Sequence, residues 1–247
     1  MAIADNLVAW YDMDEASGTR YDSTASNLDL TDVNTVGTMA GKYGNAAYAV
    51  KANNEKLTNT SFTNINAGSW TIASWVYLHE VTAWQRFFVL SQGTTGILMP
   101  SYISSTQLYI EMKDSSSTIK IDRPAGLFLT IDQWDFFTIH YDASTRKISM
   151  SVNGGALYTS AAALTGTQYT MSALYLNANE FGSTNLFTSG WDGFGVWERV
   201  LLSEERTWLY NAGAGRQYSD LVPATGSGGI FASSIFHSAI HGRTLTR

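Results

Sequence analysis

The chain has 247 residues, a formal net charge of −6, 15% charged residues and no cysteine. The lack of cysteine excludes disulfides, thiolate zinc sites and thiol nucleophiles. Phosphate binding depends on clustered Lys and Arg, and no such cluster is visible, so we expect neither nucleic acid nor an anionic membrane as a partner. The N-terminus has no basic segment before an apolar stretch, so we expect no secretory signal, and no apolar run is long enough to span a bilayer.

The predicted elements are short β-strands joined by turns. Residues 7–11 form the first, and an acidic stretch and a loop rich in turn-forming residues follow it. Residues 70–78 combine β-branched and aromatic side chains without a breaker, which predicts a strong strand. Residues 87–90 and 108–112 have the same character.

The clearest hairpin spans residues 134–155. Its first strand alternates apolar and more polar positions, and the return strand over residues 147–152 does the same. This period of two predicts one packed face and one solvent-exposed face. The pair Asn153-Gly154 tolerates positive φ and so favours a two-residue primed turn.

One short helix is predicted over residues 203–211. Ser203 can cap its free N–H groups, and acidic residues follow at the positive end of the helix dipole. Gly213 or Gly215 can stop the helix in the left-handed conformation. Trp208, with the leucine after it, would anchor the helix to the sheets.

Several landmarks occur in the order seen in one family. Residues 7–15 resemble its opening strand, 41–46 its Gly-Lys-Phe-Gly-Asn-Ala turn, 141–154 its hairpin, and 191–213 its closing strand and helix. The chain resembles the laminin-G-like, concanavalin A-like lectin/glucanase jelly-roll domains.

This resemblance implies an all-β fold: a two-sheet antiparallel jelly-roll sandwich with one short C-terminal helix. We expect this domain to occupy residues 1–220. Residues 221–247 would form a Gly/Ser linker and an extended apolar C-terminal arm.

The resemblance also implies a metal site. The family often holds a structural calcium ion where the N-terminal loop meets the last strand, and Asp22 and Asp192 stand at the matching positions, with Asn27 nearby. Calcium prefers such oxygen ligands. Alternatively, Asp22 is a turn residue that hydrogen-bonds its own backbone. Ala25 stands where the family tends to have glycine.

Catalysis is not expected. Enzymes of this fold that cleave β-glucans carry Glu-x-Asp-x-x-Glu on one strand, and this chain has no such triplet. Asp12 and Asp14 are its nearest approach, yet they match the ordinary opening strand of the family. No Ser-His-Asp set can be assembled from the four histidines, which are His79, His140, His237 and His241.

Glycan binding requires exposed aromatic faces beside polar groups. Trp84, in a loop-like stretch, is the best exposed candidate, and Phe181 and Asn185 in a later loop come next. We expect three other tryptophans to lie in the core because they fall on strands: Trp70, Trp75 and Trp197.

The C-terminal arm carries six large apolar residues outside any sandwich core: Ile230, Phe231, Ile235, Phe236, Ile240 and Leu245. Tails that stay disordered are usually poor in Ile and Phe. We therefore expect the arm to bind a partner surface, for example by adding a strand to a neighbouring sheet. The partner would be another subunit of a particle or a second copy of this chain.

Three functions are compatible with these features. Domains and tails of this type resemble those of phage structural proteins, which favours a non-enzymatic protein on the virion surface, as a capsid decoration or a tail or fibre component. Host-surface glycans would be a further partner of such a protein. The alternative is a carbohydrate-binding adhesion module of a bacterial surface protein, outside the cell. A glycoside hydrolase or lyase comes third.

Overall fold

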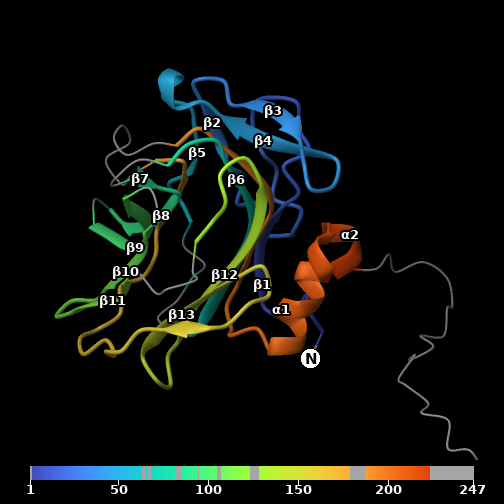
Figure 1. Cartoon of the computed structure of the whole chain (residues 1–247). Helices are drawn as coiled ribbons and strands as arrows, with labels where there is room; N and C mark the ends of the chain where they lie inside the picture. The colour runs from blue at the N-terminus through green and yellow to red at the C-terminus, as the bar shows by residue number, and fades with distance from the viewer. Residues whose placement is uncertain are drawn as a thin grey trace, which may run out of the picture.

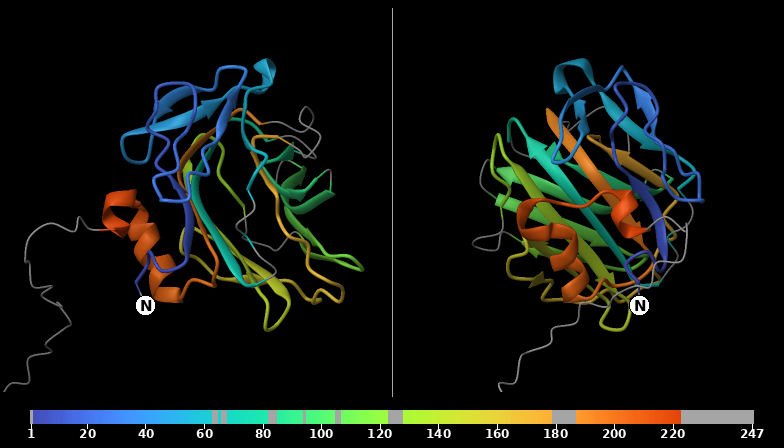
Figure 2. Two further views of the ribbon diagram at one scale, coloured as in Figure 1. Left: turned by 180° about the vertical axis from the view of Figure 1, so that it is seen from behind. Right: turned by 90° about the vertical axis from the view of Figure 1, so that its right-hand side faces the viewer.

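The computed structural model describes residues 2–62, 65, 68–81, 85–93, 95–104, 107–122, 128–178 and 187–222. The predicted sandwich is confirmed: two antiparallel sheets of eight strands each lie face to face (Figures 1 and 2). Sheet A has the order β14 (Tyr158–Thr159), β13 (Lys147–Val152), β12 (Trp134–Asp142), β6 (Trp70–Leu78), β16 (Ser189–Trp197), β4 (Asn45–Ala49) and β3 (Gly37–Ala40), and β1 (Leu7–Tyr11) also pairs with β16.

Sheet B forms the other layer. Its order is β11 (Thr118–Asp122), β10 (Gln107–Lys113), β9 (Thr95–Ser104), β8 (Phe88–Gln92), β15 (Ala173–Leu176), β5 (Lys56–Asn59) and β2 (Thr31–Val33), and β7 (Gln85–Arg86) also pairs with β9. The strands expected around residues 87–90 and 108–112 are therefore confirmed as β8 and β10.

The main core fills the space between the sheets. Alternate residues of β12 point inward, and Phe137 there stacks on Phe88 of sheet B at 5.9 Å between ring centroids. Trp191 of β16 meets the same Phe88 edge-on. Trp70, Trp75 and Trp197 are buried as predicted, but Trp75 and Trp197 belong to a second cluster on the outer face of sheet A.

Helices cover part of that outer face. α1 (Ser203–Tyr210) and the four-residue α2 (Tyr218–Leu221) lie outside sheet A, next to β1 (Figure 2). Two 3-10 turns complete the elements, η1 (Lys51–Asn53) and η2 (Asn211–Gly213). No helix in the described part of the chain is long and apolar enough to span a bilayer.

The hairpin has the predicted turn but not the predicted exposed face. Asn153 and Gly154 both have positive φ, and the Gly155 N–H donates to the Val152 carbonyl at 2.8 Å, as a primed turn requires. The expectation of a wet outer face is wrong: the outward side chains of Phe136 and Thr138 are buried. Alternation along a strand shows that two faces differ, and it does not show what covers the second face.

The ends of α1 also differ in detail from the expectation. Ser203 is its first residue, and the Glu205 carboxylate accepts the N–H of the preceding Leu202 at 2.8 Å. Asn211, rather than Gly213 or Gly215, ends the helix in the left-handed conformation. Leu209 is buried, and Trp208 packs at the edge of the outer cluster, so the anchoring interpretation is confirmed.

Candidate functional site

A line of aromatic side chains crosses the outer face of sheet A at the end that the helices leave open. Tyr48 of β4 and Tyr77 of β6 both pair with Gly190 of β16, and Trp134 of β12 pairs with Tyr77. Residues directly opposite one another across strands point to the same face. We call Tyr48, Gly190, Tyr77 and Trp134 the aromatic row. Its three aromatic side chains are all half-buried.

Gly190 makes the middle of the row flat. A Cβ at this position would lie 2.7 Å from Met39 Sδ and 3.0 Å from Trp134 Cη2, so these two side chains lie over the glycine. The rings of Tyr77 and Trp134 are 5.6 Å apart and tilted by 59°. The result is a partly exposed apolar surface four strands wide, or about 14 Å between the outer strands.

A polar rim borders this surface beside Tyr77. The Asp132 carboxylate accepts the Tyr77 hydroxyl at 3.2 Å and contacts His79 Nδ1 at 2.7 Å. The Asp132 and His79 side chains are 54% and 59% exposed, so they keep hydrogen-bonding capacity toward solvent. Burial, followed by the charge of Asp132, raises the pKa of both Tyr48 and Tyr77, so both phenols are protonated donors at neutral pH.

This combination suits a ligand with one apolar face and a polar edge. Aromatic side chains present a rigid flat surface, and the neighbouring phenol, carboxylate and imidazole groups can exchange hydrogen bonds with hydroxyls at its border.

The predicted glycan residues cannot be compared with this row. Trp84, Phe181 and Asn185 lie outside the described residues, as do all six apolar residues of the arm. Sequence reasoning missed Tyr48, Tyr77 and Trp134 as a group. Tyr77 and Trp134 were visible on predicted strands, but only the pairing register brings them into line with Tyr48.

Asp22 is the first of the predicted metal ligands, and its carboxylate is fully engaged by the protein. Oδ1 accepts the N–H groups of Trp10 and Thr24 at 3.1 and 3.0 Å. Oδ2 accepts the Thr24 hydroxyl at 2.9 Å and the Leu28 N–H at 3.0 Å. A carboxylate has about four acceptor positions, and these four hydrogen bonds fit the alternative of a turn residue. Asn27 is exposed and donates to the Ala25 carbonyl.

Asp192 has different partners and one free oxygen. It lies where β16 changes partner from β4 to β1, at a bulge between Asp192 and Gly195. The turn after β3 packs against Asp192 at this point. Asp192 Oδ2 accepts the N–H groups of Lys42 and Tyr43 at 2.6 and 3.2 Å. Oδ1 is buried without a hydrogen-bond partner among the described residues.

Burial raises the pKa of Asp192 to about 8, although the two N–H groups act against the shift, and nearby Asp14 and Asp12 add to it. The protonated acid is therefore favoured at neutral pH. Asp22 and Asp192 do not share a partner in the structure. Within its described part, no group of three His, Asp or Glu side chains is placed to hold a metal ion. Calcium binding stays a prediction.

The paired carboxylates of the first strand have structural contacts. Asp12 Oδ1 accepts the Trp10 indole N–H at 2.7 Å and the Tyr218 N–H at 2.9 Å, which ties β1 to α2. Asp14 Oδ1 accepts the Asn45 N–H at 2.7 Å. His140 is buried, and desolvation, with a smaller effect of Arg206, lowers its pKa to about 4, so it is neutral.

Comparison with solved structures finds domains of the same fold. Among solved structures, the binding domain of Paraclostridial Mosquitocidal Protein 1 is similar with a TM-score of 0.66 and 17% identity, over 85% of this chain and 53% of that one. The binding domain of botulinum neurotoxin DC, solved with SialylT, has a TM-score of 0.65 and 14% identity, over 88% and 53%. This chain thus spans about half the length of these toxin domains.

A third similar structure is matched over nearly its whole length. Domain 4 of AbnA, a GH43 extracellular arabinanase from Geobacillus stearothermophilus, was solved in complex with arabinotriose; its TM-score is 0.65 and its identity 15%, over 85% of this chain and 98% of that one. These identities support the fold alone. No curated protein sequence matches the chain.

The family itself is identified by sequence. A family model described as the concanavalin A-like lectin/glucanases superfamily matches residues 47–205, which is more than half of the chain. The match runs from β4 into α1 and so contains most of both sheets. The chain belongs to the concanavalin A-like lectin/glucanase superfamily.

Proposed function

We propose that this protein is a non-catalytic carbohydrate-binding module, and that the aromatic row is its saccharide-binding surface. The observation that carries the proposal is the alignment of Tyr48, Tyr77 and Trp134 across neighbouring strands of sheet A, with Asp132 at the rim. A sugar ring stacks its apolar face on such rings and directs its hydroxyls to the border.

The similar structures support a saccharide as ligand. The arabinanase domain that this chain matches along 98% of that domain was solved with arabinotriose. A role in binding rather than hydrolysis is supported by the carboxylates: glycosidases need two acids at opposite sides of the bond they cleave. At the aromatic row, Asp132 is already engaged by His79 and Tyr77.

A glycan array, followed by calorimetry on the best saccharide and on arabinotriose, tests the proposal. We expect Tyr77→Ala and Trp134→Ala each to weaken binding about tenfold, since an aromatic contact contributes about 1 kcal/mol beyond its buried area. Tyr175→Ala is the matched control, because Tyr175 is a half-buried aromatic residue on sheet B. Equal weakening by all three variants, or no saccharide bound, would contradict the proposal.

We further propose that the module is a component of a phage particle, as a capsid decoration or a tail or fibre protein, anchored by residues 221–247. The observation behind this proposal is the sequence of the arm, which follows a Gly/Ser linker with six large apolar residues. Deleting residues 224–247 should abolish assembly into the particle and leave the sandwich folded. An armless protein that still assembles would exclude the role of the arm, and the adhesion module of a bacterial surface protein would then be preferred.

A further inference from the structure

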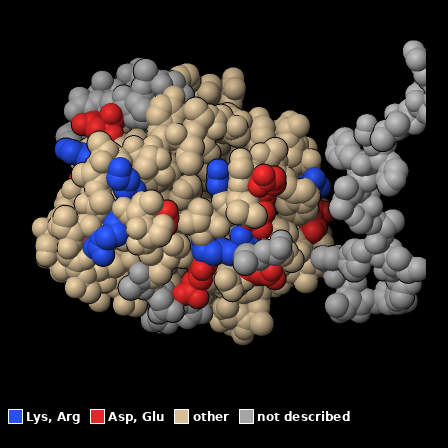
Figure 3. Space-filling model, turned by 90° about the horizontal axis from the view of Figure 1, so that it is seen from below, with Lys and Arg blue, Asp and Glu red and all other residues tan. Residues whose placement is uncertain are grey.

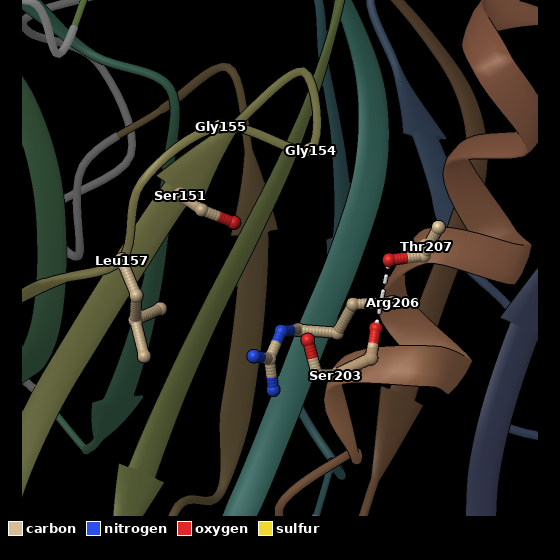
Figure 4. Close-up of a pocket in the computed structure, with 7 residues that line it drawn as sticks. All are labelled: Ser151, Gly154, Gly155, Leu157, Ser203, Arg206 and Thr207. Atoms are coloured by element: carbon tan, nitrogen blue, oxygen red, sulfur yellow. Dashed lines mark hydrogen bonds between the residues drawn. The ribbon is translucent and has the colours of Figure 1, made fainter.

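A small cavity lies on the other side of α1 from the protein's N-terminal segment. It is bounded by β13, by the turn that follows it and by one flank of α1, and its volume is about 40 Å³ (Figure 4). The lining residues are Ser151, Gly154, Gly155, Leu157, Ser203, Arg206 and Thr207. One water needs about 10–15 Å³ of such space, so the cavity can hold a group of a few atoms but not a sugar ring.

Arg206 is the charged group of this cavity. Its side chain extends from α1 toward β13, with Ser151 and Leu157 on the opposite wall (Figure 4). One guanidinium nitrogen, Nη1, donates to the Leu201 carbonyl. No acidic side chain of the described residues makes an ion pair with Arg206. A guanidinium group has five N–H donors, so the Arg206 side chain can donate further hydrogen bonds to a bound ligand.

The acidic residues of α1 face elsewhere. Glu204 and Glu205 lie with Trp208 on the opposite flank of the helix, whereas Ser203, Arg206 and Thr207 share the cavity flank through their i, i+3 and i+4 spacing. Glu205 is also neutralised, because Arg199 binds both its oxygens at 2.6 and 2.7 Å. Figure 3 shows basic and acidic groups spread over this end of the molecule on a mostly uncharged surface, with some of opposite charge side by side near its centre.

Hydroxyl groups complete the cavity. Thr207 donates its hydroxyl to the Ser203 carbonyl at 2.9 Å, and Ser151 shares a hydrogen bond of 2.9 Å with Thr138. Desolvation lowers the pKa of Arg206, although the charges of Glu204 and Glu205 act against this shift. His140 is neutral and adds no second positive charge. A small anionic group is the natural complement of this arrangement.

We propose that this cavity is a subsite for the carboxylate of an acidic sugar, with the Arg206 guanidinium as its ligand. The saccharide nature of the ligand rests on the proposed function, whereas the selection of a carboxylate rests on the cavity. The cavity and the aromatic row lie on the same face of sheet A: Thr138, beside Ser151, and Trp134 both point outward from β12. The rest of the ligand would lie outside the cavity.

Trigalacturonic acid and its methyl ester test the proposal, since they differ only in the charge and capping of the carboxylates. We expect calorimetry to show the acid binding about tenfold more tightly than the ester to the natural protein, the size of one charge-assisted contact. Arg206→Gln should remove the difference, and Arg206→Lys should restore part of it. Arg216→Gln is the control, because Arg216 stacks on Trp208 outside the cavity.

A second variant covers the case in which Arg206→Gln does not fold. Leu157 is 43% exposed at the mouth of the cavity, so Leu157→Glu should fold and should remove the preference for the acid by repulsion. Equal binding of acid and ester to the natural protein, binding of neither, or a preference that survives both Arg206→Gln and Leu157→Glu, would overturn the proposal.

The experiments distinguish failure of the carboxylate subsite from failure of the aromatic row. If acid and ester bind equally and Tyr77→Ala weakens both, the aromatic row stands and the carboxylate subsite is excluded. If the acid binds through Arg206 and Tyr77→Ala changes nothing, the aromatic row is excluded instead.

Discussion

At one end of the outer face of sheet A, Trp75 and Phe136 lie beneath Tyr210 of α1, with ring centroids 5.8 and 6.0 Å from it. At the other end, two residues along the same strands, Tyr77 and Trp134 remain half-exposed. The strands supply the same kind of side chain to both ends. What separates a core from a candidate binding surface here is therefore the reach of the C-terminal helices and not the composition of the strands.

We call the end of sheet A with Trp75 and Phe136 the covered end and the end with Tyr77 and Trp134 the open end. The largest expected effect on stability lies at the covered end. Leu209→Ala should lower the free energy of unfolding by about 3 kcal/mol, because it opens a cavity between α1 and sheet A. Urea unfolding measures this change. Leu202→Ala is the matched control: Leu202 is 57% exposed, and its truncation should change stability by less than about 0.5 kcal/mol. Equal losses would mean that α1 does not seal this end.

Asp22 tests how the covered end is held together. Asp22→Ala should cost about 2 kcal/mol, since the N–H groups of Trp10, Thr24 and Leu28 lose their acceptor. If Asp22 is a turn residue, adding EDTA or calcium leaves the unfolding midpoint of the natural protein unchanged. A midpoint that falls with EDTA and recovers with calcium would instead support the metal site implied by the family resemblance.

Asp192 gives the covered end a pH dependence. Its folded pKa of about 8 lies above the ordinary value of 3.8, so the folded protein keeps a proton that the unfolded chain releases. The contribution to stability is complete below about pH 4 and is lost as pH rises to about 8. Asp192→Asn should remove this slope and should be less sensitive to alkali than the natural protein. Parallel curves of stability against pH for the two proteins would contradict the assignment.

The smallest expected effect on stability lies at the open end. Tyr77→Ala should change the free energy of unfolding by about 1 kcal/mol or less, because its side chain is half-exposed. Thermal unfolding of this variant beside Leu209→Ala compares the two ends directly. A loss at Tyr77 as large as at Leu209 would indicate that the aromatic row is structural.

Much of the fold could be predicted from the sequence, because its signals are local. The Asn153-Gly154 turn, the strand of residues 70–78 and the helix after Ser203 each depend on short-range chemistry. The partners of the outer face could not be predicted in this way. Burial of Thr138 and exposure of Tyr77 are decided by a helix that lies more than sixty residues away along the chain.

The candidate site was even harder to predict from the sequence than the partners of the outer face. Trp84 stands alone in a loop-like stretch, and a single loop residue offers no register to test. Tyr48 and Tyr77 become neighbours of Gly190 only through pairing between strands far apart in sequence. Arg206 is an ordinary surface position by sequence, and its distinction is that it lines a small cavity once α1 packs on sheet A.

The indole N–H signals of the tryptophans offer the most direct test of the comparison between the two ends. In an NMR titration with the saccharide that binds best, the Trp134 indole signal should shift. The signals of Trp10 and Trp197, whose indoles are bonded to Asp12 and to the Ile3 carbonyl beneath the helices, should stay in place. Shifts confined to Trp10 or Trp197, or a saccharide that leaves Trp134 unchanged, would contradict the assignment of the open end as the binding surface.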